Sequence, residues 1–192
     1  MTDTADLFGE ASKTPTDRLF LGLFPDAATA AIIAGLGEDL KRKHGLKRPV
    51  HDPDRLHITL FHLGDFAGLP LDLVRRTVAA AEAMTAAPFE VTFDHATSFS
   101  GRPGNRPFIL KGSEEALTDL QAYRAALGVS LAKAGVKTTG AFTPHVTLLY
   151  DDPMIAPDPI PPVSWTVREL VLIRSHMGKS IHEPLGRWRL EA

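Results

Sequence analysis

A four-residue motif occurs twice in this 192-residue chain and constrains its fold more than any other feature. His57-Ile58-Thr59-Leu60 recurs 88 residues later as His145-Val146-Thr147-Leu148. The strand before the first motif recurs at the same offset, in the matches Arg18 with Arg106, Phe20 with Phe108 and Leu21 with Ile109. Each half also contains a predicted helix between these anchors. The repeat therefore predicts two strand–helix–strand units related by a pseudo-twofold axis.

Hydrophobic periodicity predicts mixed strands and helices along the chain. Predicted strands cover residues 18–24, 56–63, 89–97, 107–111, 142–150, 163–173 and 185–190. Predicted helices cover 27–43, 69–86 and 113–134, and a proline-rich linker covers 151–162. This order could also give a parallel α/β sheet, but the glycine fingerprint of dinucleotide-binding sheets is missing after the first strand. We therefore predict an α+β fold of two small antiparallel sheets with outer helices and a central cleft.

The composition is that of an ordinary soluble globular protein, with 44% hydrophobic and 23% charged residues. Residues 18–192 are predicted to form a single bilobal domain. The polar residues 1–17 are predicted to be a disordered leader, because they lack the apolar core of a signal peptide. No apolar run is long enough to cross a bilayer. The absence of cysteine excludes disulfides and cysteine nucleophiles and is consistent with a cytoplasmic location.

The net charge of −2 argues against a protein that coats nucleic acid. One stretch is locally basic, and its cations are Lys41, Arg42, Lys43, Lys47 and Arg48. Cations favour the C-terminal ends of helices, so this run is interpreted as a solvated helix end. The alternative is a patch that attracts phosphate backbones.

The two motifs place chemistry on one face of each strand. Side chains alternate along a strand, so His57 and Thr59 share a face, and His145 and Thr147 share the corresponding face of the second strand. Two imidazoles and two hydroxyls then converge on one volume. In-line displacement at a phosphodiester needs a base on one side of phosphorus and an acid on the other, and imidazole titrates near neutrality. The motifs offer no metal ligand set, so we predict a site with neither metal nor cofactor.

The other histidines are expected to lie apart from this chemistry. His62 falls on the apolar face of a regular strand and is expected to be buried. His44 and His51 flank the basic stretch and are expected to be exposed. His176 and His182 lie in a turn-rich segment that could border the cleft.

The paired motifs resemble those of the 2H phosphoesterase superfamily, and the chain looks similar to the bacterial RNA 2′,3′-cyclic phosphodiesterases that are also called 2′-5′ RNA ligases. The resemblance covers residues 18–190 and rests on four segments. These are Arg18-Leu19-Phe20 with Pro25, Leu56-His57-Ile58-Thr59-Leu60 with Leu63-Gly64, Pro144-His145-Val146-Thr147-Leu148, and Gly186-Arg187-Trp188-Arg189-Leu190.

The resemblance implies a bilobal fold and metal-independent hydrolysis of cyclic phosphodiesters on RNA termini or small nucleotides. It implies that His57 is the general acid, that His145 is the general base, and that the product is a 2′-phosphate. Some relatives carry a phosphate-binding arginine where this chain has Tyr150, so Tyr150 joins Thr59 and Thr147 as an expected substrate contact. The missing charge could come from Arg102, Arg106 or Arg174. We expect a monomer.

Two alternative functions remain at this point. One is a non-catalytic nucleotide- or RNA-binding module that uses the same cleft. The other is a related enzyme with different geometry, such as an RNA-end exonuclease or a phosphodiesterase for another cyclic nucleotide.

Overall fold

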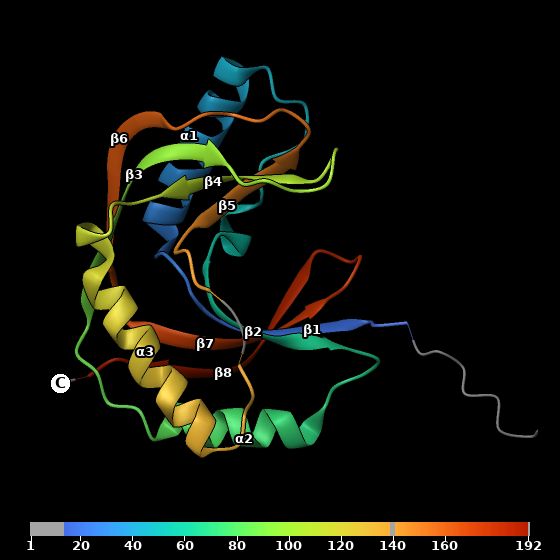
Figure 1. Ribbon diagram of the computed structural model, residues 1–192, viewed down its shortest axis with the longest axis vertical. Coiled ribbons are helices and arrows are strands. Elements are labelled where there is room, and N and C mark those ends of the chain that lie inside the picture. Colours follow the sequence, from blue (N-terminus) through green and yellow to red (C-terminus); the bar gives the residue numbers. More distant parts are fainter. Residues whose placement is uncertain (1–13, 139–140, 192) are drawn as a thin grey trace, which may run out of the picture.

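The strands pair into two four-stranded antiparallel sheets in a computed structural model, which describes residues 14–138 and 141–191 (Figure 1). The first sheet has the order β2-β1-β7-β8, with bounds Asp17–Leu23 (β1), Ile58–Phe66 (β2), Glu169–His176 (β7) and Ile181–Arg189 (β8). The second has the order β5-β4-β3-β6, with bounds Phe89–Ser98 (β3), Arg106–Lys111 (β4), Val146–Asp151 (β5) and Asp158–Val167 (β6). The α+β prediction is confirmed.

Three α-helices and two short 3-10 helices connect these strands. They are α1 (Ala27–His44), η1 (Pro53–Arg55), α2 (Leu71–Glu82), η2 (Glu115–Leu117) and α3 (Thr118–Lys133). Asp26 begins α1, because its carboxylate accepts a hydrogen bond from the Thr29 backbone N–H at 2.9 Å. Gly45 ends α1 in the left-handed region at φ 65°, which a residue without a Cβ adopts at little cost.

Helices α1 and α3 each contact the opposite sheet, which is the sheet that does not contain the strand before the helix. Helix α1 follows β1, yet a Cβ at Gly37 would lie 3.6 Å from Leu148 of the second sheet. Helix α3 follows β4, yet Arg124 donates a hydrogen bond to the Leu60 carbonyl of the first sheet at 3.1 Å. Figure 1 shows α1 behind the second sheet and α2 and α3 beside the first. The two strand–helix–strand units are therefore interlocked.

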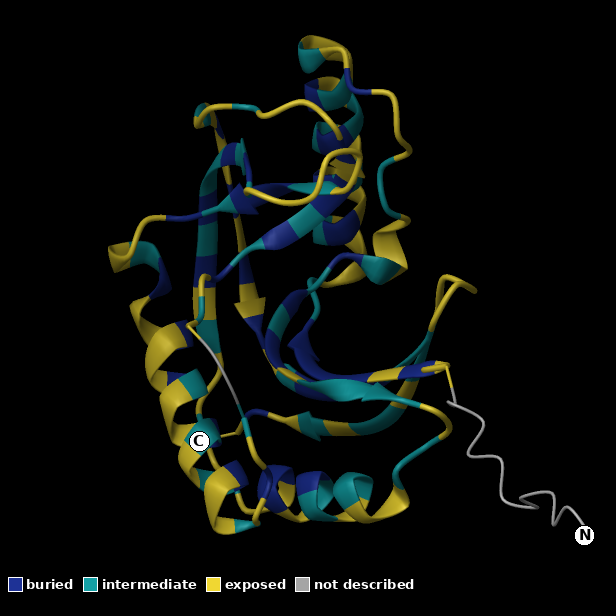
Figure 2. Cartoon of the chain, turned by 45° about the vertical axis from the view of Figure 1, so that its right-hand side comes forward, coloured by how far each residue is buried: buried dark blue, intermediate teal, exposed yellow. Residues whose placement is uncertain are grey.

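One apolar core runs through both halves. Buried residues of the first sheet, such as Leu21 and Ile58, belong to the same contact cluster as Phe108 and Leu148 of the second. Figure 2 shows the buried residues on the inward faces of the strands and helices. This continuity supports our expectation that the two lobes form one domain.

Each motif strand lies at the edge of its sheet, β2 beside β1 and β5 beside β4. The register corrects the three first-strand matches of the repeat, and the deciding pairs are Gly22 with Thr59 and Ile109 with Thr147. Strands β1 and β4 are thus related by an offset of 87, whereas the motifs keep 88. A one-residue shift turns a side chain to the opposite face of a strand. Phe20 therefore lines the cleft, while Phe108 is buried in the core.

Several predicted boundaries are wrong near the C-terminus. The predicted strand 163–173 is the end of β6 and most of β7, which are separated at Arg168. The proline-rich segment, expected to be a linker, contributes residues 158–162 to β6. Strand β6 lies at a sheet edge, where proline's missing N–H removes fewer ladder bonds. Periodicity does not show this, because proline usually indicates a break.

The expected leader, residues 1–17, overlaps the first strand, because β1 begins at Asp17. Asp17 is buried and accepts a hydrogen bond from Arg174 at 2.6 Å. Thr16 is also anchored, since its carbonyl accepts the Met177 N–H at 2.9 Å. Residues 1–13 of the expected leader lie outside the described residues. Within 14–138 and 141–191, no helix is both long and apolar enough to span a membrane.

Candidate active site

Both motif strands leave strict alternation directly after the threonine. In β2, Leu60 and Phe61 are consecutive and both buried, at a register shift against β1. This shift returns His62 to the Thr59 face, so His62 is half exposed and lines the cleft. Our expectation that His62 is buried is therefore wrong. A β-bulge reverses the facing of every later side chain, and the sequence pattern does not reveal it.

The second motif repeats this irregularity. Leu148 and Leu149 of β5 are both buried, and the register shifts against β4 at the same place. Tyr150 then points into the cleft beside Thr147. His62 and Tyr150 are therefore equivalent positions on the two walls.

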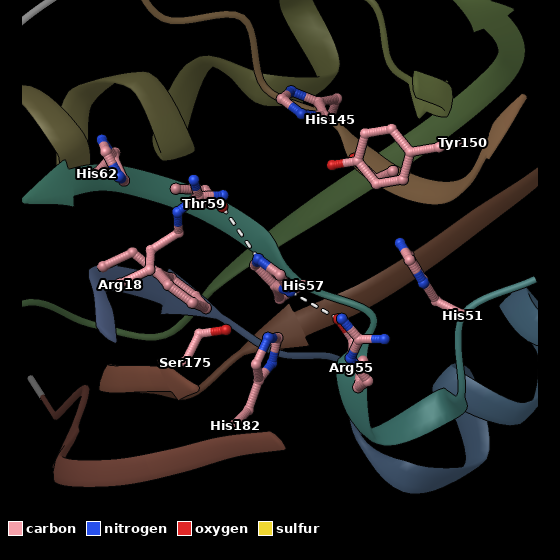
Figure 3. Close-up of a pocket in the computed structure, with 12 residues that line it drawn as sticks. Arg18, His51, Arg55, His57, Thr59, His62, His145, Tyr150, Ser175 and His182 are labelled. Carbon is pink, nitrogen blue, oxygen red and sulfur yellow. Dashed lines mark hydrogen bonds between the residues drawn. The ribbon is translucent and has the colours of Figure 1, made fainter. Parts of the chain in front are cut away.

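A cleft of about 500 Å³ lies between the two sheets (Figure 3). All five residues that the sequence singled out line it, namely His57, Thr59, His145, Thr147 and Tyr150. Seven further residues complete the wall, and these are Arg18, Phe20, His51, Arg55, His62, Ser175 and His182. The structure therefore brings the two motifs together across one volume, as the repeat predicted.

A backbone carbonyl fixes the orientation of each motif histidine. His57 Nδ1 donates a hydrogen bond to the Arg55 carbonyl at 2.6 Å, and His145 Nδ1 donates one to the Thr143 carbonyl at 2.7 Å. A carbonyl oxygen can only accept, so each Nδ1 carries a proton. In both rings Nε2 is then the atom free for proton transfer. His57 Nε2 lies 3.0 Å from the Thr59 hydroxyl.

Aromatic side chains hold both rings in place. Phe20 stacks on His57 with ring centroids 4.7 Å apart, and Phe24 packs on the same ring at 5.4 Å. Phe99 meets His145 edge-on at 4.9 Å. These contacts restrict ring rotation, so the Nε2 atoms keep their direction without a bound ligand.

Burial sets the protonation of these histidines. Burial lowers the pKa of His57 to about 3, and it also lowers the pKa of His145. The pKa of His182 falls to about 4, chiefly through burial and then through the Arg55 charge. Burial likewise lowers the pKa of His51. At neutral pH the rings of His51, His57, His145 and His182 are neutral, and each motif Nε2 can accept a proton.

The arginines expected to supply positive charge are held elsewhere. Arg106 pairs with Asp152, and Arg174 pairs with Asp17. Arg102 is exposed in the loop after β3. None of the three lines the cleft, so this prediction is wrong. Arg106 and Arg174 pair with carboxylates that lie far away along the chain, which a linear sequence does not reveal.

Two other arginines line the cleft, and only one of them is neutralised. Both Nε and Nη2 of Arg18 donate to Asp65, at 2.7 and 2.8 Å. Asp65 also contacts His62 at 3.0 Å. Arg55 makes no ion pair with a carboxylate within residues 14–138 and 141–191. The uncompensated cation of the cleft is therefore Arg55.

The basic run at the C-terminal end of α1 does not line the cleft. Lys41 pairs with Glu38, and Arg42 pairs with Asp39 on the same helix. Lys43 contacts Asp158 at 2.7 Å. This neutralisation supports the interpretation as a helix end over that of a phosphate-attracting patch.

Sequence reasoning missed the contribution of the loop before β2. His51 was expected to be exposed, yet its backbone N–H donates to the Leu148 carbonyl at 2.7 Å, and its ring lines the cleft. His44 was also expected to be exposed, but it is half-buried against Asp158. His182 was noted only as a residue that could border the cleft. Proximity in sequence to His57 was the one available signal for His51 and Arg55.

Metal binding has no evident ligand set in the described part of the chain. Residues 14–138 and 141–191 contain no group of three or more histidine and acidic side chains placed to hold an ion.

The model of one protein family matches residues 24–179, and that family is the 2′-5′ RNA ligase superfamily. This match covers most of the chain. The chain belongs to the 2′-5′ RNA ligase superfamily. No curated protein sequence matches it.

Solved structures with the same fold support this membership. E. coli LigT complexed with ATP has a TM-score of 0.71 and 24% identity, covering 93% of this chain and all of LigT. E. coli LigT complexed with 3′-AMP has a TM-score of 0.66 and 25% identity with the same coverage. The protein TT0787 of Thermus thermophilus has a TM-score of 0.66 and 24% identity, covering 90% of this chain and 97% of TT0787. The bilobal 2H phosphoesterase fold is thus confirmed.

Proposed function

We propose that this superfamily member hydrolyses 2′,3′-cyclic phosphodiesters on RNA ends or nucleotides to 2′-phosphates. One observation carries the proposal: two oriented imidazoles from symmetry-related strands, His57 and His145, line the same cleft with Nε2 available. The E. coli LigT structures with ATP and 3′-AMP add support, because a protein of this fold binds nucleotides in them. A monomeric, cytoplasmic protein is part of the proposal.

The proposed reaction is an in-line displacement at phosphorus. His145 Nε2 accepts a proton from water as the water oxygen forms its bond to phosphorus. The bond from phosphorus to the 3′ oxygen breaks, and protonated His57 Nε2 donates its proton to that oxygen. Thr59 and Thr147 donate hydrogen bonds to the non-bridging oxygens, where negative charge is held. The product carries a 2′-phosphate and a free 3′-hydroxyl.

The acid role of His57 depends on the bound substrate. In the unliganded cleft the pKa of His57 is about 3, so the ring carries no second proton at pH 7. An anionic phosphodiester beside Nε2 favours the charged ring and raises this pKa. Proton uptake therefore accompanies substrate binding, which suits a group that must give the proton up again during the reaction.

A substrate panel with product analysis tests the proposal. Nucleoside 2′,3′-cyclic phosphates and short RNAs with cyclic ends are incubated with the protein in EDTA, and products are identified by phosphorus NMR. We expect turnover in chelator and a 2′-phosphate product. A 3′-phosphate would show that the 2′ oxygen is the leaving group and would contradict the proposal, and release of mononucleotides from RNA would indicate an exonuclease.

The non-catalytic alternative has one observation in its favour. Tyr150 supplies a hydroxyl but no charge at a position where some relatives place arginine, which weakens the binding of phosphate. Calorimetric titration with AMP beside the turnover assay separates the two functions. Binding of AMP without turnover of any cyclic phosphate would establish the binding module.

A further inference from the structure

Arg55 has two separate attachments to the cleft. Its backbone carbonyl holds His57 Nδ1, while its side chain lines the wall. The guanidinium Nε is buried and has no hydrogen-bond partner. A buried donor without a partner is costly, and in native structures it often indicates a missing ligand. A guanidinium donates in a planar fork that matches a phosphate group.

Two histidines lie on either side of this guanidinium in Figure 3. His182 lines the cleft from β8, and its Nδ1 is buried and also lacks a partner. His51 lines it from the loop before η1. The Arg55 charge contributes to the lowered pKa of both rings, in agreement with its position between them. An anion at this wall would compensate the Arg55 charge.

This wall is displaced from the space between the two motif histidines. Figure 3 shows Arg55 and His182 on the side of His57 that faces away from His145. The rings of His182 and His57 meet edge-on with centroids 5.5 Å apart. An anion held by Arg55 is therefore a neighbour of the phosphate between His57 and His145, and not the same group.

We propose that Arg55, with His182 beside it, binds a second phosphate of the substrate. This phosphate is the one on the 5′ oxygen of the nucleoside whose cyclic phosphate lies between His57 and His145. The inference rests on the proposed function and makes RNA ends its substrate class. A free nucleoside 2′,3′-cyclic phosphate lacks the second phosphate and leaves Arg55 unpaired.

Two substrates that differ only in the second phosphate provide the test. Adenosine 2′,3′-cyclic phosphate is compared with the same molecule carrying a 5′-phosphate, by kcat/KM at fixed ionic strength. We expect wild type to prefer the 5′-phosphorylated substrate. Arg55→Gln should lower kcat/KM on that substrate about 10- to 100-fold more than on the other, as expected for one charge-assisted contact. Arg55→Lys should keep part of the preference.

A matched variant separates contact from long-range attraction. Arg102→Gln removes the same charge from an exposed loop outside the cleft, and it should leave the ratio of the two kcat/KM values unchanged. Equal losses on both substrates in Arg55→Gln would show that Arg55 holds the cyclic phosphate and would overturn the proposal. No loss on either substrate in Arg55→Gln would overturn it as well.

Product binding distinguishes failure of this inference from failure of the proposed function. Calorimetry compares adenosine 2′,5′-bisphosphate with adenosine 2′-phosphate, on wild type and Arg55→Gln. If wild type binds the bisphosphate more tightly than the monophosphate, and the variant binds both equally, the subsite is supported even if no substrate is turned over. Equal affinities in wild type overturn the subsite even if turnover is present.

Discussion

At the scale of single residues, the chemistry depends on which nitrogen of each imidazole faces the cleft. The carbonyls of Arg55 and Thr143 bind the two Nδ1 atoms in the same way, two residues before each histidine. This repeated contact leaves both Nε2 atoms for proton transfer. Together with the place of each histidine directly before its strand, it aims the rings.

Removal of either imidazole should abolish most turnover. His57→Ala and His145→Ala should each lower kcat about 100- to 10,000-fold on a cyclic phosphate, the usual contribution of a general acid or base. His95→Ala is the control, because His95 contacts Asp94 and does not line the cleft. Near-full activity in either motif variant would remove that histidine from the mechanism.

The buried His57 should make the protein sensitive to mild acid. Its folded pKa of about 3 lies below the ordinary 6.5, so the unfolded chain binds a proton that the folded chain does not. The contribution of this histidine to the free energy of unfolding is therefore fully present above pH 6.5. It is lost as the pH drops from 6.5 toward 3, by at most about 1.4 kcal/mol per pH unit for one site.

Urea unfolding at about pH 7 and about pH 5 measures this effect. Carboxyls with lowered pKa, such as Asp17, stay ionised in both states over this range, whereas His51, His145 and His182 titrate with the same sign as His57. His57→Gln should therefore lose less stability than wild type between the two values. An equal loss would show that His57 does not titrate on unfolding.

At the scale of elements, one loop supports the catalytic wall. The segment between α1 and β2 is tied to the second lobe by Asp151, whose Oδ2 accepts the backbone N–H groups of Lys47 and Arg48 at 2.6 and 3.1 Å. The same segment carries His51 and Arg55. A buried carboxylate at the end of β5 thus positions residues of the opposite wall.

Asp151→Ala should weaken both the fold and the site. It removes the acceptor of two part-buried backbone hydrogen bonds, which costs about 1–3 kcal/mol of unfolding free energy. It should also lower kcat/KM, since the freed loop carries the carbonyl that orients His57. Thermal unfolding and kinetics measure the two effects, with Asp39→Ala as control because Asp39 pairs with Arg42 on the exposed face of α1. Unaltered kinetics would separate the loop from the chemistry.

At the scale of the whole molecule, the crossed helices make the lobes depend on each other. Arg124 of α3 lies over the Phe61 ring of the first sheet at 4.5 Å, and Ser130 of the same helix donates to the Ala80 carbonyl of α2 at 2.8 Å. Because the apolar core is continuous, neither lobe can open without exposing core residues of the other.

The lobes should therefore unfold in one cooperative transition. The chain contains one tryptophan in each sheet, Trp165 in β6 and Trp188 in β8. Trp165→Phe leaves a fluorescent reporter in the first sheet, and Trp188→Phe leaves one in the second. In each variant, the urea midpoint measured by tryptophan fluorescence should equal the midpoint measured by circular dichroism. Separate fluorescence and dichroism midpoints would show that the lobes unfold independently.

The sequence by itself determined the fold class, the paired motif strands and the four motif residues that line the cleft, His57, Thr59, His145 and Thr147. Alternation along a strand is a local property, so the His-x-Thr pattern already decides which side chains share a face. Only the tertiary structure decided the 87-residue relation of β1 to β4, the bulges that turn His62 and Tyr150 into the cleft, and the arginines that stay available. Register and ion pairing depend on the neighbouring strand. A carboxylate neutralises Arg18, whereas Arg55 has no such partner among the described residues. This difference becomes visible only when distant segments pack together.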